Sequence, residues 1–467
     1  MALIPLPLPT ISDKGRFGED GANRLINVVL EKATLYGGRP GLVSYPRYGL
    51  TAFATLAGAS GGVRAVFDLD NTAYCVSGRQ VYQVDTSGSA TQLTGGISAD
   101  GPVRHARNMA SIPMVAMTAG GTLTLLQGGT LTEVNDEDLP PPVDVAFLGG
   151  YLVFPSSDGR FFWSAINGID VDALDFASAE YQSDRILRTI SHRNEIWHIG
   201  QGSVEVWGIT GDADAPFGRV AVRDFGCRAA GSVCEVSDTL IWINKRGEVV
   251  RSSGYDAVRI SHHAIERDIR AADPGDITAT TFALEGHSFY VLNMPTRTWV
   301  YDAPYGWTEW TSRQSARWNI SACAAFDNRV IAGSSEDGTL YEIDPDATDD
   351  AGDDLIWSVR TMAPASYPRA QVLSAVFVNV VAGRAPVDGS AEDVSPEMVI
   401  KVSRDGGNTW PVSQRRSVGL TGQRNKDVIF RSLGLSGRIG TTLELSMSAA
   451  VGSGIVSAVA EMGAAAP

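Results

Sequence analysis

Between Gly61 and Asp344 the pattern of hydrophobic and polar positions repeats about every 40–47 residues. In each copy, a short run of aliphatic and aromatic residues leads into a tight polar turn and then into a second such run. Runs of this kind joined by Asp, Asn and Gly residues are typical of β-hairpins. The copies, with their turns, are Val66–Val84 (Asp70-Asn71), Met114–Val134 (Gly120-Gly121), Val143–Trp163 (Gly149-Gly150), Ile186–Trp207 (Arg193-Asn194), Val233–Arg251 (Ser237-Asp238), Phe282–Tyr301 (Glu285-Gly286) and Ala322–Ile343 (Asp327-Asn328).

A period of this length made of strands predicts a β-propeller, with about one four-stranded blade per copy. The last five turns begin at residues 149, 193, 237, 285 and 327, so successive turns are 44, 44, 48 and 42 residues apart. Seven copies predict seven blades. Six or eight blades stay open as alternatives, because the first two copies follow the pattern less closely. Helical patterns are scarce, and the best of them is the short segment His262–Ala271.

The chain divides into four predicted parts. Residues 1–60, rich in proline and glycine, are expected to form an extended lead-in that supplies a strand to close the propeller. Residues 61–344 form the β-propeller, and residues 345–354 form an acidic linker. Residues 355–467 contain further strand-like runs separated by polar stretches, which predict a C-terminal antiparallel β-sandwich. The predicted fold class is therefore all-β.

The composition narrows the classes of partner. The 467 residues carry a formal net charge of −15, which argues against binding duplex DNA through a broad basic face. An acidic channel wall, in contrast, would repel phosphate and let DNA pass without sticking. The four cysteines form no Cys-x-x-Cys pair and are expected to be buried free thiols. The proline-interrupted start and the tail around Glu461 predict neither a signal peptide nor a membrane anchor, so synthesis in the cytoplasm is expected.

Two features of the last domain are candidate sites. The stretch from Ser403 to Trp410 matches an Asp-box, in which a Ser and an Asp bond the backbone of a hairpin turn and a Trp packs beneath it. We interpret it as a structural turn, formed by Ser403, Asp405, Gly407, Thr409 and Trp410. A basic cluster follows, which predicts a docking face for an acidic neighbouring ring or for DNA, with ordinary surface charge as the alternative. Its members are Arg415, Arg416, Arg424, Lys426, Arg431 and Arg438.

Other residue patterns that could indicate a metal, glycan or catalytic site are also compatible with ordinary structural roles. The acidic stretch 344–354 lacks the Gly and Glu spacing of a calcium-binding EF-hand loop, and the pair His262-His263 has no zinc-ligand pattern around it. Four tryptophans between 299 and 318 could form a sugar-stacking face, although core packing is the more common role. Scattered carboxylates could host a glycosidase pair; they are Asp144, Asp158, Asp170, Asp172, Asp175 and Glu180. No catalytic or nucleotide-binding motif is present, so we predict no enzyme activity, no cofactor and no metal.

Several stretches, taken in order, resemble one family. The first is Asn23–Glu31 followed by Arg39–Val43. The second is Phe161–Ser164 followed by Asp175–Glu180 and Asp184–Ile186. The third is Trp299–Asp302 followed by Trp307–Trp310, and the fourth is Ser403–Trp410 followed by Gly419–Gly422. Together they resemble the packaged-DNA stabilisation proteins, or tail accessory (nozzle) proteins, of short-tailed bacteriophages, over most of the chain.

The resemblance implies a non-enzymatic subunit of the virion tail. In such phages the protein forms a hexameric ring below the portal and adaptor rings, extends the DNA conduit and helps to retain the packaged genome. The expected partners are further copies of the chain, the adaptor and portal rings, a tail needle, plug or fibre protein, and passing genomic DNA that is not bound sequence-specifically. The alternative from another class is a glycan-binding or glycan-hydrolysing propeller that recognises a host surface.

Overall fold

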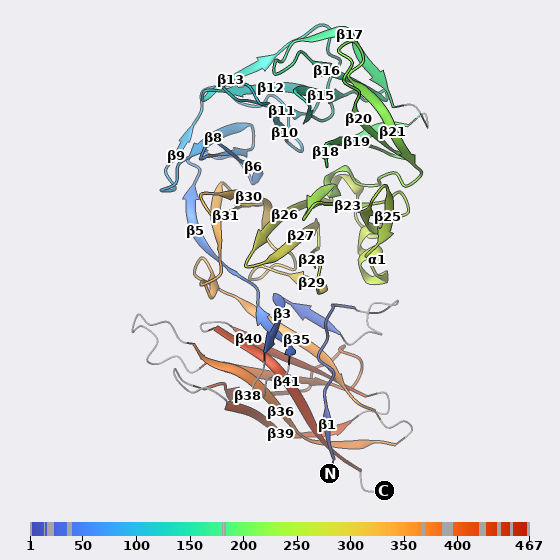
Figure 1. The fold of residues 1–467 in the computed structure, drawn as a ribbon. Coiled ribbons are helices and arrows are strands. Elements are labelled where there is room, and N and C mark those ends of the chain that lie inside the picture. The colour runs from blue at the N-terminus through green and yellow to red at the C-terminus, as the bar shows by residue number, and fades with distance from the viewer. Residues whose placement is uncertain are drawn as a thin grey trace.

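The computed structural model is an all-β protein in which a ring of sheets adjoins a second, layered domain (Figure 1). It describes residues 2–13, 15, 23–34, 40–179, 181, 184–365, 369–384, 396–419, 426–436, 440–448 and 452–464. Within those ranges the only α-helix is α1 (His263–Ala271), which agrees with the predicted helical segment. Two single turns of 3-10 helix, η1 (Ala230–Ser232) and η2 (Pro274–Asp276), complete the non-strand elements.

Seven four-stranded antiparallel blades form the ring, as the seven sequence copies predict. The first strand of each blade is innermost, and most neighbouring first strands contact one another around the centre (Figure 1). The blades are β6 (Val63–Leu69), β7 (Thr72–Ser77), β8 (Gln80–Val84), β9 (Ala90–Gln92); β10 (Arg104–Arg107), β11 (Met114–Ala119), β12 (Thr122–Gln127), β13 (Thr130–Val134); β14 (Ala146–Leu148), β15 (Tyr151–Pro155), β16 (Arg160–Ser164), β17 (Val171–Ser178); β18 (Ile186–His192), β19 (Glu195–Gly200), β20 (Val204–Ile209), β21 (Phe217–Arg223); β22 (Cys234–Val236), β23 (Thr239–Ile243), β24 (Val249–Ser253), β25 (Asp256–Arg259); β26 (Thr278–Leu284), β27 (His287–Met294), β28 (Arg297–Asp302), β29 (Gly306–Trp310); and β30 (Ile320–Phe326), β31 (Arg329–Ser334), β32 (Thr339–Asp344) with β5 (Gly49–Thr55).

The predicted turns are hairpin turns of the expected geometry. In all seven, both central residues have positive φ, from 45° at Ser237 to 98° at Gly150. This is the requirement of a type I′ turn, whose twist matches that of the flanking strands. In six blades the turn joins the first and second strands, but Gly120-Gly121 joins the second and third strands of blade 2. The copy Met114–Val134 is therefore out of phase by one strand, because the longer loop 108–113 before it has no two-residue turn.

The ring is closed by a strand from near the N-terminus. β5 is the outermost strand of blade 7 and pairs antiparallel with β32, with Leu50 opposite Ile343. The first strand of blade 1 and the last blade also meet directly, since the Ser321 hydroxyl donates to the Val63 carbonyl oxygen at 2.5 Å. A Cβ on Gly333 would lie 2.5 Å from the Val63 side chain, so glycine is needed for this close approach. The propeller ring is thus closed by the pairing of β5 with β32, two strands about 290 residues apart in sequence.

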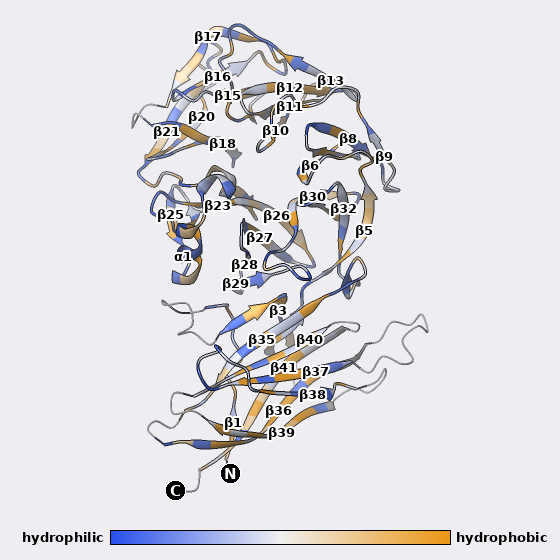
Figure 2. Cartoon of the chain, turned by 180° about the vertical axis from the view of Figure 1, so that it is seen from behind, coloured by the Kyte–Doolittle hydropathy of each residue, from blue (hydrophilic) through white to orange (hydrophobic). Residues whose placement is uncertain are grey.

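The second domain is a β-sandwich that draws strands from both ends of the chain. One sheet has the order β3 (Val28–Thr34), β4 (Pro40–Pro46), β41 (Gly452–Ala464), β36 (Gln371–Arg384) and β39 (Lys426–Ser436), and β1 (Ala2–Pro5) also pairs with β41. The other has the order β2 (Arg24–Ile26), β35 (Ile356–Ala363), β40 (Thr441–Ser448), β37 (Glu397–Ser403) and β38 (Val412–Ser417). The two sheets enclose one apolar core, which includes the fully buried Leu25, Trp357, Val378, Phe430 and Ile455. Figure 2 shows the hydrophobic stretches along these strands.

The N-terminal segment is therefore more than an extended lead-in. β1, β3 and β4 belong to one sandwich sheet, β2 belongs to the other, and β5 alone enters the propeller. Their apolar side chains, such as Val28 and Leu30, are buried in the sandwich core. The acidic segment also gains structure, because β33 (Asp349–Asp350) pairs in parallel with β5 and antiparallel with β34 (Asp353–Asp354).

Candidate functional site

The junction between propeller and sandwich is built around one buried arginine. Arg47 has a side chain with no solvent exposure, and it forms an ion pair with Asp350 at 2.5 Å. Its other donors reach the Asn27 side-chain oxygen at 3.1 Å and the backbone oxygens of Tyr48 and Thr311 at 2.9 and 3.1 Å. Because these partners come from the N-terminal segment, blade 6 and the acidic segment, Arg47 holds three distant parts of the chain together.

Asn27 completes this junction. It has a positive φ of 54° and its side chain uses both of its polar atoms. The amide nitrogen donates to the Thr311 hydroxyl and to the Ile356 carbonyl oxygen, while the amide oxygen accepts from Arg47 and from the Thr311 backbone N–H. Asn27 therefore links the end of β29 to the start of β35 across β2.

A shared sheet makes the junction continuous. β2 pairs in parallel with β29 of blade 6 and antiparallel with β35 of the sandwich. Glu309 on β29 is 1% exposed, and its carboxylate accepts from Arg24 on β2 at 2.9 Å and from Arg297 on β28 at 2.6 Å. One buried carboxylate shared by two arginines requires all three strands to keep their register, so the two domains are joined as one body at this edge.

The acidic segment is engaged by arginines. Asp350 is the partner of Arg47, and Arg313 lies 3.2 Å from Asp353 and 3.6 Å from Asp354. Asp349 turns back to accept from the Gly352 backbone N–H at 3.1 Å. The carboxylates that would have to line a calcium loop are thus committed to a β-hairpin and to ion pairs at the junction.

The Asp-box residues form a turn between β37 and β38. The Ser403 hydroxyl donates to Asp405 at 2.6 Å and accepts from the Gly407 backbone N–H at 2.8 Å. Asp405 also accepts from the backbone N–H and the hydroxyl of Thr409, at 2.9 and 2.6 Å. These bonds, with that from Ser403 the largest contribution, hold the pKa of Asp405 below its ordinary range. The Arg360 guanidinium lies over Trp410, and its central carbon is 4.8 Å from the centre of the tryptophan ring.

The basic cluster is only partly within the described residues. Arg415 and Arg416 lie on β38 and Arg431 lies on β39, and all three are exposed. The Gln414 side chain donates to the Arg431 carbonyl oxygen at 2.7 Å, so the two strands meet at one edge of the sandwich. Arg424 and Arg438, as well as the side chain of Lys426, fall outside the described residues. The docking face stays a prediction, now with three arginines at a common edge.

The tryptophans of blade 6 and the loop after it do not form a sugar-stacking face. Trp299, Trp307, Trp310 and Trp318 are each 2% exposed or less and belong to two apolar cores. Trp310 and Trp318 pack edge to face at 4.9 Å, and Arg47 lies 5.4 Å from the Trp318 ring centre. Packing under the junction is the role of these four tryptophans, so they do not supply the stacking surface considered from the sequence.

Three of the scattered carboxylates have separate structural partners. Asp144 is fully buried and paired with Arg188. Asp158 accepts from Arg160 at 2.8 Å and from Ser156, and these bonds lower the pKa of Asp158 to about 2. Asp172 accepts from the Leu174 backbone N–H in the β17 edge strand. Glu180 lies outside the described residues.

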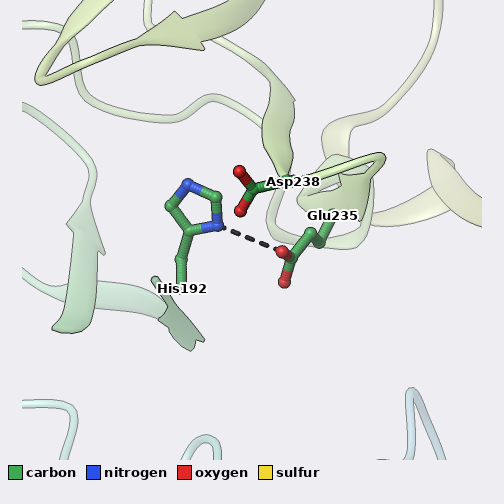
Figure 3. A group of neighbouring side chains, drawn as sticks. All are labelled: His192, Glu235 and Asp238. Atoms are coloured by element: carbon green, nitrogen blue, oxygen red, sulfur yellow. Dashed lines mark hydrogen bonds and ion pairs between the residues drawn. The ribbon is translucent and has the colours of Figure 1, made fainter. Parts of the chain in front are cut away.

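One group of side chains has the composition of a cation site (Figure 3). His192 at the end of β18 lies with Glu235 on β22 and Asp238 in the next turn, and one ligand atom of each falls within 4.8 Å of the others. The His192 Nδ1 is 3.2 Å from the Glu235 carboxylate. Asp238, however, is already bound by Arg193 at 2.7 Å. A cation at this position would have to compete with Arg193, so the arrangement serves first as an ion-pair link between blades 4 and 5.

The central channel of the propeller is crossed by an arginine. Arg104, the first residue of β10 in blade 2, extends to the Ala230 carbonyl oxygen of η1, which lies in the connection that leads into blade 5, at 3.5 Å. Arg188 of blade 4 and Arg104 line one cavity in this channel. The channel is therefore spanned by charged side chains and is not an open passage along its length.

A model of the phage stabilisation family, described as the bacteriophage P22 Gp10 β-propeller, matches residues 24–348. The chain belongs to this family. The match runs from the first residue of β2 to the residue before β33, so it includes all seven blades and the closing strand β5. Family membership confirms the resemblance seen in the sequence and makes the chain a structural, DNA-stabilising phage protein and a component of the virion.

Solved structures of other proteins are similar only at a distance. The computationally designed Ika8 protein is 15% identical over 63% of this chain and 99% of its own, with a TM-score of 0.40. Virginiamycin B lyase from Staphylococcus aureus is 11% identical over 62% of this chain and 96% of its own, with a TM-score of 0.43. BamB from Moraxella catarrhalis is 12% identical over 73% and 97%, with a TM-score of 0.40. No curated protein sequence matches the chain.

A membrane-spanning helix is not found among the residues that the structure describes.

Proposed function

We propose that the chain is the ring-forming nozzle subunit of a short phage tail, which extends the DNA conduit and helps to retain the packaged genome. The observation that carries this proposal is the family match over residues 24–348. The fold supports it because a seven-bladed propeller fixed to a sandwich by a continuous sheet is a stiff building block, and closed rings need subunits of fixed shape. The suggested ring has six copies, with the adaptor and portal rings above it.

The conduit of this proposal is the lumen of the ring and not the channel of a single propeller. Arg104 crosses the propeller channel to blade 5, which leaves no route for a duplex. Each copy would therefore present an outer surface of its propeller or sandwich to the DNA. Interfaces between copies would close the wall.

Charge suggests which surfaces face which partner. Residues 47–354 contain 22 Lys and Arg against 41 Asp and Glu, a net charge of −19. Residues 1–46 and 355–467, which form the sandwich, contain 16 Lys and Arg against 12 Asp and Glu, a net charge of +4. We infer that the acidic propeller lines the lumen, where it repels phosphate, and that the basic sandwich edge docks on an acidic neighbouring ring. The distal end would meet the needle, plug or fibre protein.

Electron microscopy of the purified protein, alone and mixed with the portal and adaptor proteins of the same phage, tests the proposal. Closed six-fold rings, or rings that form only on the adaptor, are the expected result. A protein that stays monomeric with both partners contradicts the ring, and a strongly basic lumen contradicts the inferred orientation. The double variant R415E/R416E should weaken adaptor binding, while R79E, an exposed arginine on blade 1, serves as the matched control.

A further inference from the structure

A cavity of about 440 Å³ lies in the propeller channel, between the innermost strands of blades 2, 3 and 4. Arg104 and Arg107 of β10 and Arg188 of β18 line it, together with Thr189 and Ser191. Arg107 is paired with Asp70 in the neighbouring blade at 2.8 Å. The charge of the cavity is therefore set by Arg104, Arg188 and Asp144, a carboxylate that is paired with Arg188 and attracts Arg104.

Asp144 cannot neutralise both arginines. Its side chain is fully buried, and it accepts from the Val145 and Thr189 backbone N–H groups at 2.8 and 2.7 Å as well as from Arg188. Those three donors occupy both of its oxygens. One positive charge is left over in the cavity, inside a domain whose net charge is strongly negative.

The two guanidinium groups have donors to spare. The Nε of Arg188 is buried without a hydrogen-bond partner. The contact of Arg104 with the Ala230 carbonyl oxygen is long, at 3.5 Å. Loss of hydration and the charge of Arg188 lower the pKa of Arg104 to about 10. Loss of hydration in the narrow channel and then the charges of Arg188 and Arg104 lower the pKa of His105 to about 4, although its side chain is exposed to the channel, so it adds no charge at neutral pH.

Two arginines that line one cavity are costly unless an anion joins them, since like charges repel and both lose part of their hydration. Guanidinium groups present planar pairs of donors that match the oxygens of phosphate. We propose that the channel cavity binds a small oxyanion of the phosphate class between Arg104 and Arg188. The anion bridges blade 2 to blade 4 and, through Arg104, to blade 5, so it fastens the centre of the propeller. This site is independent of the proposed ring and of DNA.

Titration of the full-length protein with inorganic phosphate, against potassium chloride at the same ionic strength, tests the site. Isothermal calorimetry and the unfolding temperature are the two readouts. We expect saturable binding and a rise in the unfolding temperature of the wild-type protein. R104Q should weaken phosphate binding about tenfold or more, because it removes a charge-assisted hydrogen-bond donor.

Two further variants keep the test decisive. R188K retains the ion pair with Asp144 but loses the planar pair of donors, so it should bind phosphate with intermediate affinity even if R104Q fails to fold. R79Q removes an exposed arginine that is paired with Asp100 outside the cavity, and it should bind as the wild type does. Absence of saturable binding, or equal binding by wild type, R104Q and R188K, would overturn the proposal.

Discussion

The propeller and the sandwich are both all-β, but they are assembled in opposite ways. Six of the seven blades are made from one continuous stretch of chain each, and the seventh needs only β5 from elsewhere. In the sandwich, β1, β3 and β4 pair in one sheet with β36, β39 and β41, so the contacts join residues more than 400 positions apart. Local hairpins thus define one domain, and the meeting of the two chain ends defines the other.

The two domains also differ in electrostatics. The propeller carries a net charge of −19 and all six histidines, whereas the sandwich carries a net charge of +4 and no histidine. A perturbation that acts through histidine therefore reaches only the propeller. The junction belongs to both domains, whereas each surface turn belongs to one domain only. Variants at the junction, at a propeller histidine and at the surface turns therefore separate the interactions that join the two domains from those that stabilise each domain.

The largest effect is expected at the junction. R47M leaves the buried carboxylate of Asp350 without its arginine partner and removes one of the two donors to the Asn27 side-chain oxygen, which keeps only the Thr311 backbone N–H. Breaking a buried ion pair from one side costs about 3–5 kcal/mol. The free energy of unfolding, measured in denaturant, should fall by this amount, and both domains should become easier to cleave by a protease because β5, β29 and β35 lose a common anchor.

Two variants control this experiment. R47M/D350L removes both charges and should recover part of the loss, since an apolar pair of similar volume avoids the stranded carboxylate. R79M breaks an exposed pair on blade 1 and should change the stability little. Equal losses in R47M and R79M would mean that the junction contributes no more than an ordinary surface pair.

The second effect is confined to the propeller and depends on pH. His198 is 2% exposed, stacks on Phe161 at 4.2 Å and contacts the Thr189 hydroxyl at 2.9 Å, and burial lowers its pKa to about 3. Below about pH 6.5 the unfolded chain takes up a proton that the folded chain refuses, so the free energy of unfolding decreases as the pH falls. One such group accounts for about 1.4 kcal/mol per pH unit, or about 2 kcal/mol between pH 7.5 and 5.

H198Q should remove that part of the slope. Unfolding curves at several pH values give the slope directly, and the comparison does not depend on how much H198Q costs at neutral pH. The same substitution at the exposed His263 provides the baseline. A wild-type slope that H198Q leaves unchanged would show that His198 is not the group that titrates.

The sequence predicts the part of this fold that is local. Each two-residue turn, such as Asp327-Asn328, has positive φ at both residues, and the Asp, Asn and Gly residues common at these positions predict such a turn. Only at blade 2 does this signal mislead, because the longer loop 108–113 replaces the first turn and the next turn, Gly120-Gly121, takes its place in the pattern. The pairing of the N-terminal strands escapes a sequence-based prediction for a different reason. Val28 and Leu30 indicate a strand, but nothing near them indicates that its partner lies at the other end of the chain.

The functional residues divide in the same way. The Asp-box is visible because its hydrogen bonds join residues at most four positions apart, from Ser403 to Thr409. Arg47 with Asp350, and Arg104 with Arg188, are pairs made by tertiary structure, and isolated arginines in an acidic chain give no signal in the sequence. Nothing near the acidic segment in the sequence indicates that it packs at the junction, because its buried partner Arg47 lies about 300 residues away.

The smallest effect compares matching turns in the two domains. Asp405 in the sandwich and Asp85 in the β8–β9 turn of blade 1 each accept from a Ser hydroxyl and from backbone N–H groups, and in both cases these bonds lower the pKa of the carboxyl group. D405N and D85N should each cause a small loss of stability at pH 7. The loss should shrink as the pH falls below about 4, because a carboxylate with a lowered pKa stabilises the fold only while it is ionised.

The pair of variants decides what the Asp-box turn is for. If it is only a structural turn, D405N and D85N lose similar stability, show a smaller loss at pH 3 than at pH 7 and leave ring formation unchanged. If the turn is part of the sandwich docking edge, D405N alone weakens binding to the adaptor while its unfolding curve matches that of D85N. The hydroxyl groups of Ser403 and Thr409 both donate to Asp405 inside the turn, so the structure favours the first result. Denaturant unfolding at pH 7 and pH 3, combined with adaptor binding, separates the two.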